Sequence, residues 1–122
     1  MKSKVNVLFF DDAKEDYQKL KQNLNNNFHL TLFNSINSKV DLLKDNYVVG
    51  KQIPKKRIPK KYVQKYGVTN LWKINLSDYW RIIYTLRQKQ RSSEVEILEI
   101  FLDVLDIIDH KRYNKIFGYK KN

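Results

Sequence analysis

The sequence predicts one α+β domain, an antiparallel sheet of about four strands with an N-terminal helical hairpin on one face. Three observations support this fold class. A β-branched and aromatic run, VNVLFF, stands near the start of the chain, two segments with apolar residues at helical spacing follow it, and two alternating runs, WKINL and WRIIYTL, come later. The predicted order is β-α-α-β-β-β with a short C-terminal helix. A chain of 122 residues has the usual length of a single domain, here 1–122.

Apolar residues at helical spacing identify the two helices of the hairpin. The first is expected over 13–24, with one face formed by Ala13, Tyr17, Leu20 and Leu24. Three asparagines at 25–27 end it. The second is expected to end near Asn46, with a stripe formed by Leu32, Phe33, Ile36, Val40 and Leu43. The connector is short, so the two helices should pack side by side and cover a sheet with their apolar stripes.

The remaining strands are expected in the second half of the chain. The two alternating runs should form an antiparallel hairpin that turns at Ser77 and Asp78, and a further strand is expected over 94–105. The preceding stretch, GKQIPKKRIPKKYVQKYG, is expected to be irregular because Pro54 and Pro59 interrupt it. Asp109 is expected to cap a short last helix, and Gly118 is expected to end it.

Alternation along the strands assigns side chains to two faces. The face under the helical hairpin should hold the core, formed by Phe9, Leu20, Phe33, Trp72, Ile74, Trp80, Ile82 and Tyr84. The opposite face should carry Lys73, Arg81, Arg87 and the C-terminal tail. An arginine between Trp80 and Ile82 on so apolar a strand needs a reason.

Composition excludes several classes of protein. There is no cysteine, so neither a disulfide framework nor a thiolate metal site is available, and the two histidines lie too far apart in sequence to predict a zinc site. No apolar run approaches the ~20 residues of a membrane span. The N-terminal segment becomes acidic after one short apolar stretch, which is not typical of a signal peptide. A cytoplasmic protein without metal or other cofactor is therefore expected.

The net charge of +11 is concentrated in one segment. Residues 51–91 hold twelve lysines and arginines against one acid, Asp78, whereas the segments before and after are nearly balanced. A concentrated charge of this kind produces a directional field, and a polyanion is its natural partner.

Three stretches together resemble a known family: GKQIPKKRIPKKY, NLWKINLSDYWRIIYTL and DHKRYNKIFGY. The pattern is similar to the RelE/ParE toxin superfamily, and most similar to its RelE-like branch. The resemblance runs from the first strand to the tail, and its most specific parts are W-R-I-I-Y and H-x-x-Y-x-x-x-F-G-Y. It implies a toxin of a type II toxin–antitoxin system that inhibits translation by cutting mRNA in the ribosomal A site without metal. ParE-like members instead poison DNA gyrase.

The resemblance also implies roles for individual residues. Arg81 stands where cutting members hold the scissile phosphate, and His110 and Tyr113 stand where a histidine or tyrosine moves protons or stacks on a base. The basic residues that match RNA contacts are Lys56, Arg57, Lys60, Lys61 and Lys73. Some members use a glutamate–histidine pair as the base, and this chain has no clear equivalent of that glutamate.

Metal-free RNA cleavage needs a base for the 2′-hydroxyl, a cation for the phosphorane oxygens and an acid for the leaving 5′-oxygen. The arginine side chain suits the second role, since its guanidinium is planar and binds two phosphate oxygens at once. The imidazole of His110 can serve as acid or base. Tyr113 and Tyr119 can stack on a base or pack the tail against the sheet. Further phosphate contacts are expected from Arg87, Lys111 and Arg112, whereas His29 is expected to be structural.

Three functions remain open on the sequence alone. The first is the ribosome-dependent endoribonuclease, the second a gyrase-directed toxin on the same fold, and the third a non-catalytic basic RNA-binding module. Either toxin implies a cognate antitoxin whose acidic or amphipathic segment covers the basic face, which would give a toxin–antitoxin hetero-oligomer.

Overall fold

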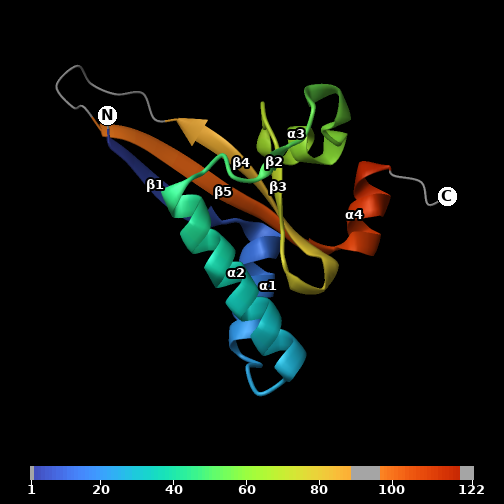
Figure 1. Cartoon of the computed structure of the whole chain (residues 1–122). Coiled ribbons are helices and arrows are strands. Elements are labelled where there is room, and N and C mark those ends of the chain that lie inside the picture. The colour runs from blue at the N-terminus through green and yellow to red at the C-terminus, as the bar shows by residue number, and fades with distance from the viewer. Residues whose placement is uncertain (1, 89–96, 119–122) are drawn as a thin grey trace.

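The structure, a computed structural model, describes residues 2–88 and 97–118 and is an α+β fold (Figure 1). Its elements follow the order β1 (Lys2–Phe9), α1 (Asp11–Lys21), α2 (Asn27–Asp45), β2 (Lys51–Gln52), the 3₁₀ turn η1 (Lys55–Arg57), α3 (Lys60–Tyr66), β3 (Trp72–Asn75), the 3₁₀ turn η2 (Ser77–Tyr79), β4 (Trp80–Gln88), β5 (Ile97–Asp109) and α4 (His110–Phe117). The α+β class expected from the sequence is confirmed.

The sheet differs from the expected one in strand number and direction. Across the described residues it has five strands in the order β1-β5-β4-β3-β2, and β1 runs parallel to β5 while the other pairs are antiparallel. The expectation of about four antiparallel strands is therefore met only in part, since β2, β3, β4 and β5 pair antiparallel and β1 adds a fifth, parallel strand. Apolar alternation identifies strands but carries no information on their direction, which follows from how the chain returns to the sheet. Here β5 lies between β1 and β4.

The helical hairpin of α1 and α2 covers one face of the sheet (Figure 1). Its fully buried residues include Ala13, Ile36 and Leu43, which pack with Ile82 and Tyr84 of β4 in a first core. Each buried isoleucine or leucine side chain of this core contributes about 1.5–3 kcal/mol to the free energy of unfolding. Of the predicted core residues, Ile74, Ile82 and Tyr84 are buried, and the others are half-buried at its margin: Phe9, Leu20, Phe33, Trp72 and Trp80.

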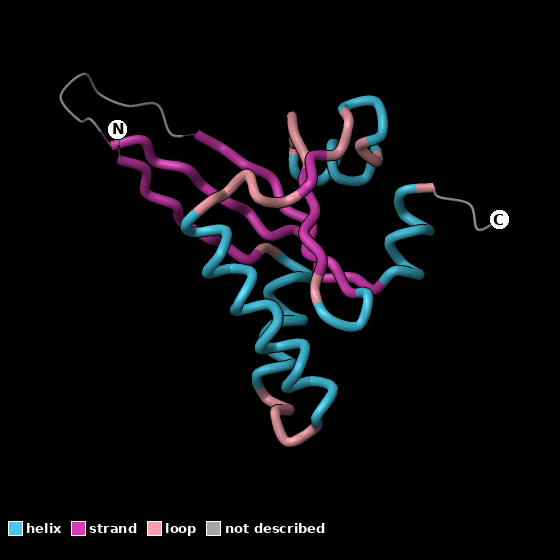
Figure 2. Tube along the Cα trace, viewed as in Figure 1, coloured by secondary structure: helices cyan, strands magenta, loops and turns pink. Residues whose placement is uncertain are grey.

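The opposite face carries a second core that the sequence analysis did not expect. Ile83 of β4 and Leu105 and Ile108 of β5 pack there under Tyr62 of α3 and Tyr113 of α4. Figure 2 shows α3 and α4 lying away from the α1–α2 hairpin, on the other side of the strands. The basic face is therefore partly covered by two short helices.

The segment expected to be irregular contains one of these helices. Pro59 is the N-cap of α3, with φ −61°, and the helix ends at Gly67 with φ 64°. Proline forbids a helix that passes through it but is compatible with one that begins directly after it, because the first helical N–H groups have no intrahelical partner. The prolines were correctly read as breaks, but the two turns that follow were missed.

The helix ends were predicted with unequal success. For α4, the Asp109 side chain accepts a hydrogen bond from the Arg112 backbone N–H at 2.8 Å, and Gly118 has φ 72°, so both predicted caps are confirmed. For α1, the helix spans Asp11–Lys21 instead of 13–24. The second helix begins at Asn27 because the Asn26 side chain caps it by accepting from the His29 N–H.

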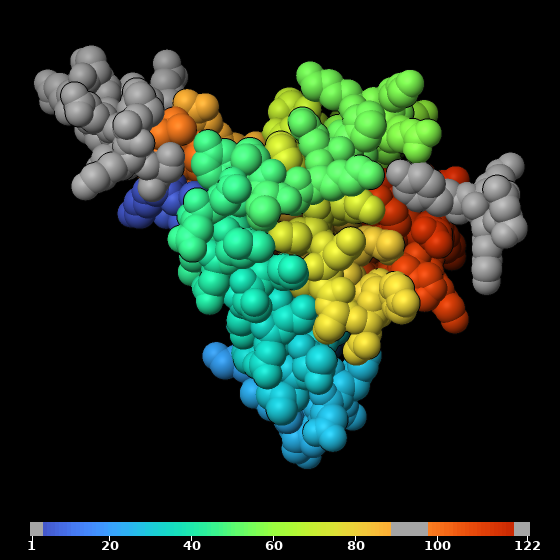
Figure 3. Space-filling model, viewed as in Figure 1, coloured from blue at the N-terminus to red at the C-terminus, as the bar shows by residue number. Residues whose placement is uncertain are grey.

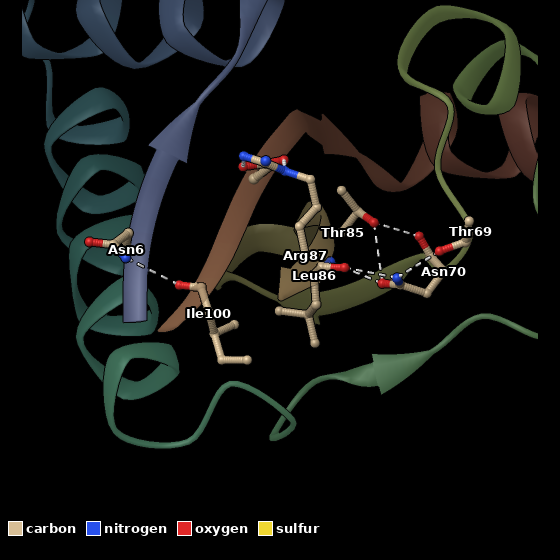
Figure 4. A network of polar contacts seen from close by, with 8 residues as sticks. Asn6, Thr69, Asn70, Thr85, Leu86, Arg87 and Ile100 are labelled. Carbon is tan, nitrogen blue, oxygen red and sulfur yellow. Dashed lines mark hydrogen bonds and ion pairs between the residues drawn. The ribbon is translucent and has the colours of Figure 1, made fainter. Parts of the chain in front are cut away.

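A side-chain network fixes the entry of β3 against β4 (Figure 4). The Asn70 amide pairs with both backbone groups of Leu86, its oxygen accepting from the N–H at 2.9 Å and its nitrogen donating to the carbonyl at 2.9 Å. The Thr85 hydroxyl donates to the Asn70 carbonyl at 2.7 Å. Asn70 therefore acts as an extra rung of the β3–β4 ladder and sets the register that places Asn75 opposite Arg81.

A buried carboxylate joins α3 to the sheet. Asp106 is 5% exposed, and it accepts a hydrogen bond from the Tyr62 hydroxyl at 2.7 Å while the Lys61 ammonium lies 3.6 Å away. Burial and the neighbouring carboxylate raise the pKa of the Tyr62 phenol well above its usual value of 10.0. Burial likewise raises the pKa of Tyr84, to about 12.

These two phenols make stability sensitive to alkaline pH. Their pKa values are higher folded than unfolded, so the stability they contribute is complete below pH 10 and declines as pH rises above it. We expect the free energy of unfolding, measured in urea between pH 8 and 11, to fall above pH 10, and to fall less in Tyr62→Phe. The control Tyr79→Phe removes an exposed phenol and should leave the decline unchanged. An identical decline in wild type and Tyr62→Phe would contradict this account.

Candidate functional site

Arg81 lies near the end of β4 that is next to η2, on the face of the second core. Its backbone is opposite Asn75 of β3 and Ile108 of β5. The guanidinium carbon lies 4.3 Å from the centre of the Tyr113 ring, within the range of a cation–π contact. A central strand with neighbours on both sides is a rigid mount for a functional side chain.

The Arg81 guanidinium has unused hydrogen-bonding capacity. Its Nε and Nη1 atoms are buried, and within the described part of the chain neither has a hydrogen-bond partner. Buried polar groups are nearly always paired in native proteins, and an unpaired one is costly. A guanidinium is best satisfied by a planar or tetrahedral oxyanion that accepts two of its N–H groups.

The Tyr113 ring packs against the Arg81 guanidinium. It is 3% exposed and stacks on Phe117, with ring centroids 4.3 Å apart. The Lys73 ammonium lies 4.9 Å from the centre of the same ring, so two cations share it. The Tyr113 ring is therefore engaged by protein groups, and its predicted stacking on a base would require it to leave them. Its predicted part in proton transfer stays a prediction.

His110 is exposed at the first position of α4, directly after β5. Its ring meets the Tyr79 ring edge-on, with centroids 5.7 Å apart. Tyr79 and Arg81 line one hollow of about 410 Å³, together with Asn75, Leu76 and Asp78. His110 is not among the residues that line this hollow, but it contacts one of them, Tyr79. On α4 it is also three residues before Tyr113, which places both on one side of the helix.

Asp78 is a site residue that the sequence analysis treated only as part of a turn. It is the carboxylate among the residues lining the Arg81 hollow, and it is exposed. Its φ of 56° and that of Tyr79, 64°, shape the turn of the β3–β4 hairpin. The signal that could have found it is its isolation, since it is the single acid in 51–91.

Three of the predicted phosphate contacts meet in a basic hollow between α3 and α4. Lys61, Lys111 and Arg112 line a space of about 720 Å³, which also involves Lys115 and Asp109. The sequence analysis missed Lys115. It follows Lys111 by four residues on α4, and that spacing places the two on one side of the helix.

Lys73 belongs to a second basic groove. This groove, of about 410 Å³, also contains Lys39 of α2 and Lys51 of β2, and it shares Asn75 with the Arg81 hollow. Neither Lys39 nor Lys51 was predicted, because the register that sets Lys51 opposite Lys73 depends on the fold of the segment between them. The groove and the Arg81 hollow therefore both border Asn75 of β3.

The remaining predicted site residues are placed differently. Lys56, Arg57 and Lys60 are exposed in η1 and at the start of α3, and none of them lines the hollows described above. Tyr119 lies outside the described residues, so its predicted role stays a prediction.

The Arg87 side chain is already bound to a carboxylate of the protein. Its guanidinium forms two hydrogen bonds to the Asp103 carboxylate, which is 3% exposed, and lies over the Phe101 ring. It is six residues from Arg81 along β4, roughly 20 Å at the usual rise of a strand. A phosphate contact by Arg87 would have to compete with this buried carboxylate.

His29, near the start of α2, lies in a different groove from the Arg81 hollow. It lines a groove of about 480 Å³ with Asp16, Trp80, Asp109 and other residues of α1, α2 and α4. Its Nδ1 atom is buried, with no hydrogen-bond partner in the described structure. Burial raises the pKa of Asp16 in the same groove. The structural role expected for His29 is not tested by this placement.

Two features are absent from the described residues. No cluster of three or more His, Asp or Glu side chains there could hold a metal ion. None of the helices in 2–88 and 97–118 has both the length and the apolar character to cross a bilayer. No protein-family model, curated protein or solved structure matches the chain, so its function has to be inferred from the arrangement of its own residues.

Proposed function

We propose that this chain is an RNA-cleaving toxin of the RelE/ParE type, a metal-independent endoribonuclease that cuts mRNA on the ribosome. The observation that carries the proposal is the Arg81 guanidinium, mounted on a central strand with two buried N–H groups that lack a partner in the described structure. A phosphodiester in the hollow would supply the acceptors once the guanidinium turns these covered N–H groups toward it. Around it lie an imidazole, a carboxylate and two basic surfaces.

The surrounding charge supports a nucleic acid as the ligand. One basic groove, with Lys39, Lys51 and Lys73, borders Asn75, which also lines the Arg81 hollow, and the basic hollow of Lys61, Lys111 and Arg112 lies at α4. Lysines and arginines along a strand path hold successive phosphates without reading the base sequence. Affinity would therefore come from both surfaces and chemistry from the hollow.

The reaction is an internal transesterification. The ribose 2′-oxygen attacks the phosphorus, the bond from phosphorus to the 5′-oxygen breaks, and the products are a 2′,3′-cyclic phosphate and a 5′-hydroxyl. Arg81 stabilises the negative charge that collects on the phosphorane oxygens. His110 transfers one of the two protons of the reaction. Asp78, the carboxylate that lines the hollow, can transfer the other.

A toxin of this kind acts in the cytoplasm and has to be held inactive by a partner. We propose a cognate antitoxin whose acidic or amphipathic segment lies across the basic surfaces and forms a hetero-oligomer with the chain. The gene beside this one should encode such a small protein.

The test is cleavage of mRNA in programmed ribosomes by the purified chain, which is treated with a chelator and dialysed beforehand. We expect products that end in a 2′,3′-cyclic phosphate and a 5′-hydroxyl. His110→Ala should lower the cleavage rate about 10²–10⁴-fold, the usual contribution of a general acid or base. The matched control is His29→Ala, which removes the other histidine of the chain and should leave the rate unchanged.

The alternatives give different results in the same experiment. A gyrase-directed toxin leaves mRNA intact and inhibits supercoiling of plasmid DNA. A non-catalytic module binds RNA but yields no product and is indifferent to His110→Ala. Either pattern would refute the nuclease.

A further inference from the structure

Tyr79 is an unusually exposed aromatic residue. It is 76% exposed, whereas the other exposed large hydrophobic residues of the described chain range from 38% to 49%. Isolated exposed apolar residues are common, but a large one beside a candidate site calls for an explanation. Figure 3 shows the β3–β4 turn, in yellow, at the surface between the helical hairpin and α4.

The backbone at this residue is unusual as well. Asp78 and Tyr79 both have positive φ, 56° and 64°, in a region that residues with a Cβ seldom adopt. Aspartate enters this region more easily than most residues, so the unusual residue of the two is Tyr79. Strained residues of this kind persist only where surrounding contacts hold them, and they gather at functional sites.

The surrounding contacts hold the turn firmly. The Leu76 N–H donates to the Trp80 carbonyl at 2.7 Å and closes the hairpin. The Ser77 N–H donates to the Ser35 hydroxyl of α2 at 3.0 Å. The turn is therefore tied both to its own strand and to the helical hairpin, and the Tyr79 ring is presented from a fixed base.

Tyr79 also lies where a nucleotide would be bound. It shares the hollow with Arg81, and its ring contacts His110. Tyr113, for which the sequence analysis left stacking and packing equally open, is buried between Phe117 and two cations. Of the two rings, the one with free surface next to the phosphate-binding cation is Tyr79.

We propose that Tyr79 is a nucleobase-stacking subsite, which holds the base of a nucleotide that flanks the linkage bound at Arg81. This inference rests on the proposed function and adds to it a contact with the base. Stacking on an aromatic ring tolerates any base, because every base has a π face, and it favours purines through their larger area. Tyr79 is thus a positioning residue for the base, while Arg81 holds the phosphate.

The test separates binding of the nucleobases from binding of the phosphate backbone. Binding is measured for an oligoadenylate of about nine nucleotides and for a matched oligomer of abasic nucleotides with the same phosphates. Wild type should bind the oligoadenylate about 5- to 100-fold more tightly, the range for one stacked base. Tyr79→Ala should lose that preference and still bind the abasic oligomer like wild type. Tyr79→Phe keeps the ring and should keep the preference.

Phe28→Ala is the matched control, since it removes another exposed aromatic ring, on α2, and should keep the preference for bases. The inference is overturned if wild type shows no preference for bases, or if Tyr79→Ala retains it. An equal loss on both oligomers would also overturn it, because Tyr79 would then act only by supporting the fold or His110. If the preference depends on Tyr79 but no RNA is cleaved, the subsite stands and the nuclease proposal fails.

Discussion

Arg81→Ala should abolish RNA cleavage and growth arrest while leaving the fold intact. A preorganised donor at the developing charge typically contributes 10²–10³-fold, about 2.7–4 kcal/mol, and Arg81 offers two such N–H groups. The fold should survive because the guanidinium has few protein partners to lose, chiefly the Tyr113 ring. The measurement is the single-turnover cleavage rate in programmed ribosomes, with the far-UV circular dichroism spectrum of each variant.

Two further variants sharpen this prediction. Arg81→Lys keeps the charge but loses the planar fork, so it should recover only a small part of the rate. Lys44→Ala removes an exposed cation from the last turn of α2 and should cleave like wild type, which controls for net charge. Full toxicity of Arg81→Ala would remove this residue from the mechanism.

Gly50→Ala should be the most destabilising small substitution near the site. A Cβ at this position would overlap the Tyr84 hydroxyl and lie 2.7 Å from the Lys73 carbonyl oxygen. The first atom belongs to a fully buried side chain and the second to the backbone of β3, so neither can move away easily. Overpacking of this kind costs about 1–3 kcal/mol and more when backbone is involved, and we expect about 3 kcal/mol or above.

The control is Gly67→Ala, where φ is 64° but an added Cβ meets nothing within 4 Å. It should cost about 1 kcal/mol, from conformation alone. The double variant Gly50→Ala/Tyr84→Phe removes the hydroxyl clash and should recover part of the loss, since the contact with the Lys73 carbonyl remains. Urea unfolding measures all three, and equal losses for Gly50→Ala and Gly67→Ala would disprove the steric account.

Features of the fold that depend on neighbouring residues were predicted, and features that depend on distant residues were not. The caps of α4, Asp109 and Gly118, were predicted because a cap depends on the few residues beside it. The β3–β4 hairpin was predicted because both strands alternate around one short turn. The parallel pairing of β1 with β5 joins segments more than ninety residues apart, as in the Asn6–Glu99 hydrogen bond, and no local pattern reports it.

The candidate site shows the same division. Residue type and strand position pointed to Arg81, and the chemistry of imidazole pointed to His110. The sequence did not show that Tyr113 would be buried under the Arg81 guanidinium, or that Tyr79 would project beside it. Both depend on where α4 and the turn come to rest against the sheet.

The sequence by itself therefore determined the α+β class and the concentration of positive charge in 51–91, and it pointed to Arg81 as the cation of the proposed site. Only the tertiary structure decided which cations remain available. Arg81 and Arg87 lie on one strand, yet Arg87 is bound to Asp103 while two N–H groups of Arg81 have no partner in the described residues. The physical reason is that availability depends on which groups are packed within a few ångströms, and those groups come from distant parts of the chain.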